Sequence, residues 1–137
     1  DAASMYLITK PEWFDVIVAT NLFGDILTDE GAAIQGSIGL AAGANLNPER
    51  RYPSMFEPIH GSAPDIAGRG IANPIAMIWS VSMMLDFLGH PELGKLVMQA
   101  IECTLSDCKA PRPTDLGGTA STSQVGDAVC ERLLALK

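Results

Sequence analysis

The chain has 137 residues, of which 16 are acidic and nine are basic, so its formal net charge is -7. A chain of this length can form one compact domain, because it can bury roughly two thirds of the surface that its unfolded form exposes. Its basic residues are scattered, which argues against nucleic-acid or anionic-membrane partners, since both are bound by clustered Lys and Arg.

The first predicted elements are a strand and a helix. Residues Phe14 to Ala19 form a short apolar run rich in β-branched side chains, which suits a buried strand of a parallel or mixed sheet. Asn21 is expected to cap the helix that follows. The apolar positions of this helix recur at helical spacing: Leu22, Ile26, Leu27 and Ile34. A strand that leads directly into a helix is typical of an α/β fold.

The next segment, residues 36–64, is rich in Gly, Pro and Asn and has too little periodicity for a long element. Residues 45–58, NLNPERRYPSMFEP, are expected to form an ordered loop. Loops of this length inside a compact enzyme are often functional.

Three helices are predicted in the second half of the chain. The first runs from about Pro74 to Leu88, with a proline in its first turn and Gly89 at its end. It is apolar nearly all round, so we expect it to be buried against a sheet or another subunit, with Met83 and Trp79 as packing residues. Two more helices are expected at Pro91 to Ser106 and at Ser121 to Ala135.

The three cysteines do not form a C-x-x-C pair, and none has a histidine at metal-ligand spacing. Cys103, Cys108 and Cys130 are therefore interpreted as reduced, mostly buried thiols. The sequence has no recognisable leader and no apolar run of about 20 residues that would span a membrane. We expect a cytoplasmic protein.

Asp25 and Asp29 are the first candidate ligands. Four residues apart on a helix, they lie on one face, where two carboxylates repel each other unless a cation or solvent separates them. Mg²⁺ and Mn²⁺ prefer oxygen ligands, and Mg²⁺ often takes only one or two protein carboxylates. The pair therefore fits a metal site, and by spacing alone it fits a solvated polar face equally well.

A second candidate site extends from His60 to Gly68 and on to Asn73. Its small residues allow the backbone to approach a ligand closely, and an Asp beyond them, Asp65, can accept hydrogen bonds from a ribose diol while repelling a 2′-phosphate. This pattern favours NAD over NADP. It is not the G-x-G-x-x-G fingerprint, however, and from composition alone a tight loop with a capping Asp explains it as well.

Together these segments resemble the isocitrate and isopropylmalate dehydrogenases, a family of metal-dependent β-decarboxylating dehydrogenases. Residues 21–46, NLFGDILTDEGAAIQGSIGLAAGANL, look like the metal-binding signature of that family. Residues 57–76, EPIHGSAPDIAGRGIANPIA, look like its cofactor loop. The resemblance continues through residues 82–89, SMMLDFLG, to residues 114–129, TDLGGTASTSQVGDAV, so it covers essentially the whole chain.

The resemblance implies an α/β fold with a mixed sheet flanked by helices. It implies that Asp25 and Asp29 bind Mg²⁺ or Mn²⁺ together with the substrate, and that Asp1 supplies a third carboxylate to the site of a partner subunit in a homodimer. It further implies that NAD is bound, with Asp65 on the ribose hydroxyls. The residues expected to hold the adenosine half of NAD are His60, Gly61, Ser62, Ala63, Pro64, Asp65, Ile66 and Asn73.

The chain also departs from the family pattern. The resemblance implies a catalytic Lys and Tyr and substrate-binding arginines in upstream motifs, and the lysines and tyrosines present here do not lie in matching contexts. Residues 1–137 are therefore expected to be the C-terminal portion of one such domain in a two-domain protein. Alone, this chain is expected to expose apolar surface, to dimerise poorly and to show no turnover.

The substrate is expected to be a small 2-hydroxy dicarboxylic acid. Residues 47–50, N-P-E-R, resemble the D-malate and tartrate dehydrogenase branch, because isopropylmalate dehydrogenases usually have a shorter Gly-rich turn there. Two alternatives remain: a 3-isopropylmalate dehydrogenase with the same chemistry, or a non-catalytic binding or regulatory subunit. The presence of Asp25, Asp29 and Asp65 argues against the second alternative.

Overall fold

The computed structural model describes residues 1–136. Its helices and strands, in chain order, are α1 (Ala2–Thr9), α2 (Asn21–Ile34), β1 (Ala42–Asn45), β2 (Met55–Pro58), α3 (Ile75–Phe87), α4 (Pro91–Ser106) and α5 (Thr122–Ala135). Three short 3-10 turns connect them: η1 (Pro11–Trp13), η2 (Ile38–Leu40) and η3 (Thr114–Leu116). Within residues 1–136, no helix is both long enough and apolar enough to cross a membrane.

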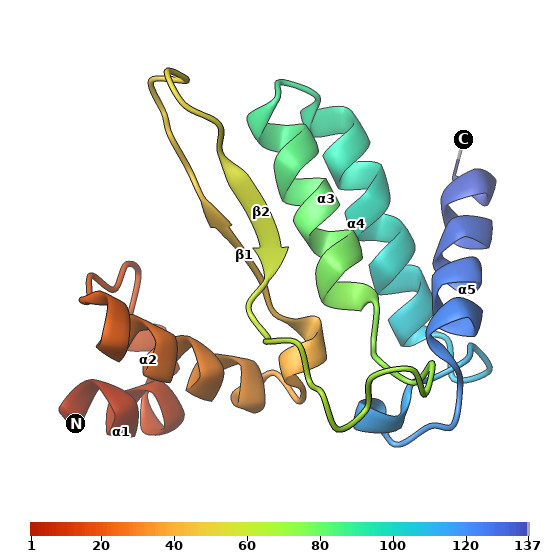
Figure 1. The fold of residues 1–137 in the computed structure, drawn as a ribbon, viewed down its shortest axis with the longest axis horizontal. Helices are drawn as coiled ribbons and strands as arrows, with labels where there is room; N and C mark the ends of the chain where they lie inside the picture. Colours follow the sequence, from red (N-terminus) through yellow and green to blue (C-terminus); the bar gives the residue numbers. More distant parts are fainter. Residues whose placement is uncertain (137) are drawn as a thin grey trace.

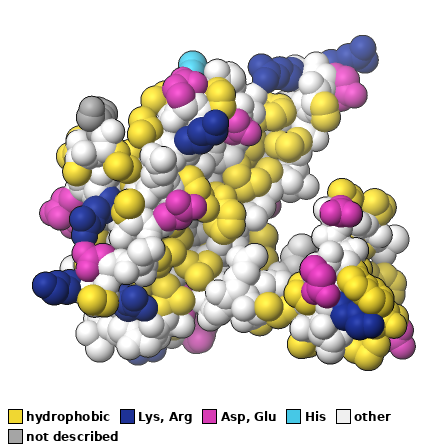
Figure 2. Space-filling model, turned by 180° about the vertical axis from the view of Figure 1, so that it is seen from behind, with side chains coloured by type: hydrophobic (Ala, Val, Ile, Leu, Met, Phe, Trp, Pro, Cys, Tyr) yellow, Lys and Arg dark blue, Asp and Glu magenta, His cyan; other side chains and the backbone are white. Residues whose placement is uncertain are grey.

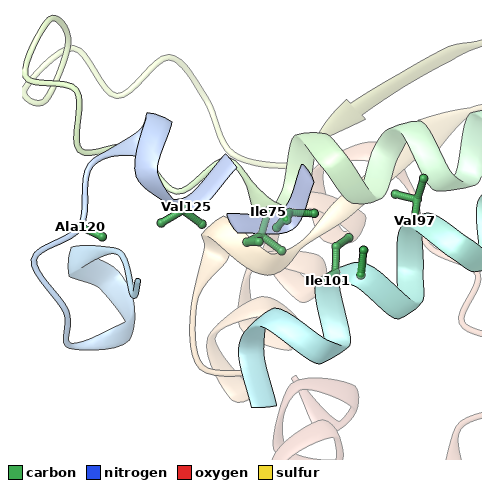
Figure 3. Close-up of a cluster of buried hydrophobic side chains, with 7 residues drawn as sticks. Ile75, Val97, Ile101, Ala120 and Val125 are labelled. Carbon is green, nitrogen blue, oxygen red and sulfur yellow. The ribbon is translucent and has the colours of Figure 1, made fainter. Parts of the chain in front are cut away.

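The core of the molecule lies between the three C-terminal helices, which stand side by side in Figure 1. Ile75 from α3, Ile101 from α4 and Val125 from α5 are each at most 2% exposed and belong to one cluster, shown in Figure 3. Complete burial of such a side chain stabilises the folded state by about 1.5–3 kcal/mol. These contacts hold the C-terminal helices together as one packed unit.

The three helices predicted for this region are confirmed. Pro74 is the N-cap of α3, and Gly89 follows its end with a φ of 93°, a left-handed conformation that glycine adopts without strain. Helix α4 has the predicted bounds. Helix α5 begins after Ser121, whose hydroxyl accepts from the backbone N–H of Gln124 while the Gln124 side chain accepts from the backbone of Ser121.

Helix α3 packs against the β1–β2 sheet, as expected, although only part of its apolar surface is buried within residues 1–136. Its small residues Ala76 and Ser80 are at most 1% exposed, whereas Met77 is 52% exposed and Val81 is 39% exposed. The reason is that α4 and the β1–β2 hairpin contact this helix from two sides and leave a third side uncovered within residues 1–136.

The N-terminal helices α1 and α2 form a separate lobe, shown at the lower left of Figure 1. Ala32 is the one buried residue in these two helices. Leu22 and Phe23 are more than 60% exposed, and Figure 2 shows hydrophobic side chains gathered on the surface of this lobe. The lobe therefore has little core of its own.

The strand predicted at Phe14 to Ala19 is wrong for the described structure. The segment is not paired with any strand, and its side chains are not buried: Val16 is 82% exposed and Val18 is 94% exposed. A strand needs a neighbouring strand for its backbone hydrogen bonds, and within residues 1–136 only β1 and β2 pair. The β-branched composition of this segment favours a strand, but no strand lies beside it within residues 1–136.

The strands that do form were predicted as part of a loop. β1 and β2 are antiparallel, with Ala42 opposite Pro58 and Asn45 opposite Met55. Their sequences, AGAN and MFEP, contain no Val, Ile or Thr and are poor in the residues that favour strands. The tip of the hairpin lies against the end of α3, where the Arg50 guanidinium sits 4.9 Å from the centre of the Phe87 ring.

The cysteines differ from expectation in their burial. Cys103, Cys108 and Cys130 are free thiols, as predicted, but all three are exposed. Cys103 and Cys130 lie on the outer faces of α4 and α5, because the inner faces of these helices are occupied by Val97, Ala100, Ile101, Val125 and Val129.

Candidate active site

One cavity of about 560 Å³ is open on the side of α2 that faces the hairpin. We call it the carboxylate cavity, because Asp25, Asp29 and Glu57 all line it. The other lining residues are Thr28, Gly43, Ala44, Asn45, Pro58, Ile59, His60 and Gly61. No Lys or Arg is among them, and His60 is the one lining residue that could carry a positive charge.

Helix α2 places the two predicted aspartates in this cavity. Because they are four residues apart, both project from the same side of the helix. Between them, the Thr28 hydroxyl donates to the backbone carbonyl of Gly24 at 2.9 Å and is satisfied within the helix. Asp25 and Asp29 are both exposed. Glu57 reaches the same space from β2.

A second cavity, of about 760 Å³, lies between the 60–73 loop and the start of α5. We call it the loop cavity. It is lined by residues 37–39 of the η2 turn, residues 60–63, 66–68 and 70–73 of the loop, and Thr114, Asp115 and Thr122. No Lys or Arg lines it, so it offers no ammonium or guanidinium group to a ligand phosphate.

The 60–73 loop is a succession of tight turns that only small residues permit. Ala63 has a φ of 43°, and Gly68 and Gly70 have φ values of 77° and 64°. Backbone hydrogen bonds close the turns, including Ile66 N–H to the Ala63 carbonyl at 3.1 Å. The backbone therefore forms much of the wall of the loop cavity, and a ligand can approach it closely.

Helix α5 anchors the far end of this loop. The Thr122 hydroxyl donates to the Ala72 carbonyl at 2.6 Å, and the Thr122 backbone N–H donates to the Gly70 carbonyl at 2.9 Å. Thr122 thus fixes two consecutive parts of the loop against a helix that belongs to the packed core.

The two cavities meet at His60 and Gly61, which line both. His60 Nδ1 lies 3.0 Å from the backbone carbonyl of Gly61. A ligand in the loop cavity that extends past Gly61 therefore reaches the carboxylate cavity. This adjacency is the geometry that a two-substrate reaction needs, because the reacting atoms of both ligands must come within van der Waals contact.

Most of the residues predicted for cofactor binding line the loop cavity. His60, Gly61, Ser62, Ala63, Ile66 and Asn73 do so, whereas Pro64 and Asp65 are exposed and lie outside the lining. Asp1 lines neither cavity. It is the N-cap of α1, and its side chain accepts a hydrogen bond from the backbone N–H of Ala2. Within residues 1–136, no three His, Cys, Asp or Glu residues are arranged to hold a metal.

Several residues that complete the loop cavity from outside the loop were not predicted from the sequence. Ser37, Thr114, Asp115 and Thr122 were not proposed as site residues. The resemblance of residues 114–129 to the family indicated that this segment belongs to the site. It did not indicate which of its side chains face the 60–73 loop. No Lys or Tyr of the chain lines either cavity.

Comparison with known proteins agrees with the resemblance seen in the sequence. Residues 1–129 match the sequence model described as isocitrate/isopropylmalate dehydrogenase. A Bacillus subtilis protein named "Probable tartrate dehydrogenase/decarboxylase" is 53% identical over 136 residues, which are 99% of this chain and 38% of that protein. A Thermobifida fusca 3-isopropylmalate dehydrogenase is also 53% identical, over 97% of this chain and 36% of that protein.

Among solved structures, an isocitrate dehydrogenase from Methylococcus capsulatus superimposes on this chain with a TM-score of 0.90 at 43% identity. The match covers 97% of this chain and 39% of that structure. The α/β fold class predicted from the sequence is thus confirmed. The chain spans less than two fifths of the length of the relatives it matches.

Proposed function

The chain belongs to the isocitrate/isopropylmalate dehydrogenase family, and we propose that its two adjoining cavities are the substrate side and the cofactor side of one active site. The protein would oxidise a small 2-hydroxy dicarboxylic acid with NAD and decarboxylate the product. The observation that carries this proposal is that the carboxylate cavity and the loop cavity share His60 and Gly61.

The loop cavity suits the adenosine half of NAD. Its wall is formed by backbone and small side chains from His60 to Asn73, which allow close approach. The absence of Lys and Arg from its lining favours NAD over NADP, because a 2′-phosphate needs a basic partner. Asp65 lies in the same loop, outside the cavity lining, and would accept hydrogen bonds from the ribose hydroxyls.

The carboxylate cavity suits Mg²⁺ or Mn²⁺. Asp25 and Asp29 line a cavity without Lys or Arg, and hard divalent cations are bound by such carboxylate oxygens. Asp1 of a second copy would supply a further carboxylate in a homodimer. When bound, the cation supplies positive charge that stabilises the negative charge developing on the substrate oxygen during oxidation and decarboxylation.

The residues of this chain then have defined tasks. Asp25 and Asp29 would hold the cation, and the 60–73 loop would hold the adenosine half of NAD. The Lys and Tyr expected to move protons are not among the residues that line the cavities. The exposed apolar surface of the α1–α2 lobe supports an extensive contact with further protein, either the rest of the protein or a second copy. A cytoplasmic location is part of the proposal.

For the substrate, D-malate or tartrate is the leading candidate. The N-P-E-R stretch and the similarity to a tartrate dehydrogenase/decarboxylase support it. The equal identity to a 3-isopropylmalate dehydrogenase supports the neighbouring alternative. Residues 46–54 at the hairpin tip line neither cavity, so this loop does not itself contact a ligand there.

The test is NADH formation by the full natural chain that carries this sequence, with Mn²⁺ and with D-malate, tartrate and 3-isopropylmalate offered in parallel. A preference for D-malate or tartrate supports the leading proposal, and a preference for 3-isopropylmalate moves the protein to the neighbouring branch. Binding of NAD and Mn²⁺ without turnover of any of the three would favour the non-catalytic subunit.

Asp25→Asn is the matched test of the metal assignment. It should lower Mn²⁺ affinity, measured by the electron spin resonance of free Mn²⁺, by about tenfold or more, because a charged ligand becomes neutral. Asp15→Asn, in the exposed segment before α2, is the control and should leave Mn²⁺ affinity unchanged. Equal effects of the two substitutions would contradict the assignment.

A further inference from the structure

We infer that Asp115 is a positioning residue of the cofactor site, which fixes the side-chain amide of Asn73 in the loop cavity; this inference rests on the proposed function. Asp115 is 42 residues away from Asn73 in the chain and 78 away from Ser37. One of the two carboxylate oxygens of Asp115, Oδ2, accepts hydrogen bonds from both Asn73 and Ser37. Three separate segments of the cavity wall therefore meet at one atom.

The hydrogen bonds determine which way the Asn73 amide points. Asn73 Nδ2 donates to Asp115 Oδ2 at 2.9 Å, and Asn73 Oδ1 accepts from the backbone N–H of Ile75 at 3.0 Å. An ionised carboxylate only accepts and a backbone N–H only donates, so the reverse orientation of the amide would lose both bonds. One N–H of the amide remains for a ligand in the loop cavity, which Asn73 lines.

Ser37 holds the carboxylate in turn. The Ser37 hydroxyl donates to Asp115 Oδ2 and accepts from the backbone N–H of Gly39 at 3.0 Å. Ser37 is 8% exposed, so it is part of the packed wall and not a mobile surface group. Ser37, the N-cap of the η2 turn, thus holds Asp115 at the same oxygen that Asn73 contacts.

Two glycines show that the network is closely packed. A Cβ at Gly39 would lie 2.7 Å from Asp115 Oδ2 and 2.8 Å from the Asn73 Cβ. A Cβ at Gly118, in the turn that carries Asp115, would lie 2.0 Å from the Arg112 carbonyl oxygen. Neither position leaves space for a larger residue, so the backbone around Asp115 and Asn73 is held at close contact.

The test measures the dissociation constant of NAD for the full natural chain and its variants. Asp115→Ala should raise this constant about tenfold, the effect of losing a hydrogen bond to a charged group. Asp115→Asn, which retains an oxygen acceptor, should raise it less. Asp127→Ala, an exposed aspartate on α5, is the control and should leave it unchanged.

A double substitution separates positioning from general structural support. If Asp115 acts through Asn73, then Asp115→Ala should change NAD affinity less than about twofold when Asn73→Ala is already present. An undiminished effect in that background would overturn the inference, because Asp115 would then act on the ligand or on the fold independently of Asn73. The same holds if Asp115→Ala alone leaves NAD affinity unchanged.

A third measurement keeps the inference distinct from the proposed function. In nuclear magnetic resonance spectra, Asp115→Ala should shift the side-chain amide signals of Asn73 in the absence of any ligand, whereas Asp127→Ala should not. Unshifted Asn73 signals overturn the inference while leaving NAD binding intact. Absence of NAD binding by the unsubstituted protein overturns both the proposed function and the inference.

Discussion

The two cavities differ in how they are supported. The loop cavity is bounded by segments attached to the C-terminal core: α3 begins two residues after Asn73, and α5 begins at Thr122, which is hydrogen-bonded to Gly70 and Ala72. The carboxylate cavity depends on α2, a helix with one buried residue, Ala32. One side of the site therefore lies on a rigid framework, and the other lies on a lobe with little core of its own.

This difference indicates which part of the site the described residues can form on their own. Precise ligand positions require side chains and backbone that are locked by packing. The loop cavity meets this condition within the described residues. The carboxylate cavity offers two helical carboxylates and one from β2, and its support must come from contacts with further protein if it is to bind a cation tightly.

The largest expected effect separates the core from the lobe. Ile101→Ala should lower the free energy of unfolding by about 2–5 kcal/mol, because Ile101 is 2% exposed within the core cluster. Ile26→Ala, at a site 55% exposed on α2, should lower it by less than about 1 kcal/mol. Urea denaturation measures both free energies of unfolding. Equal decreases in the two variants would contradict the difference in packing between the core and the lobe.

A smaller effect tests the turn beneath the loop cavity. Gly118→Ala should destabilise the protein by about 1–3 kcal/mol, since its Cβ would lie 2.0 Å from the Arg112 carbonyl oxygen. Gly126→Ala, inside α5 with nothing within 4 Å of the new Cβ, should instead stabilise it by about 0.5–1 kcal/mol. The melting temperatures of the two variants should move in opposite directions; a shift in the same direction would contradict the close packing of this turn.

The smallest effect concerns the helix start that anchors the loop. Ser121→Ala removes the acceptor for the Gln124 backbone N–H and should cost about 1 kcal/mol. Ser123→Ala, at the exposed second residue of the same helix, is the control and should change stability by less than about 0.5 kcal/mol. If thermal unfolding shows both changes to be alike, the cap does not hold the helix start.

The sequence predicted the C-terminal helices well, because their signals are local. Pro74, Gly89 and Ser121 mark helix ends through their own backbone preferences, whatever the rest of the fold does. The strand at Phe14 to Ala19 failed for the opposite reason. Its composition favours a strand, but a strand exists only with a partner, and the described residues contain none beside it.

The site was predictable to the extent that its residues are contiguous. The 60–73 loop carries its own pattern of Gly, Ala and Asn, so the sequence pointed to it directly. Asp115 and Ser37 line the same cavity from distant segments, and the residues beside them in the sequence do not indicate which side chains they contact. Such long-range contacts arise from packing, which a linear pattern does not encode.

Cofactor binding by the loop cavity can be tested by titrating NAD into this chain and following its backbone amide signals by nuclear magnetic resonance. We expect saturable shifts at Gly61, Asn73 and Thr122, with the Asp25 and Asp29 signals of α2 changing little. Absence of shifts, or shifts concentrated on α2, would contradict it.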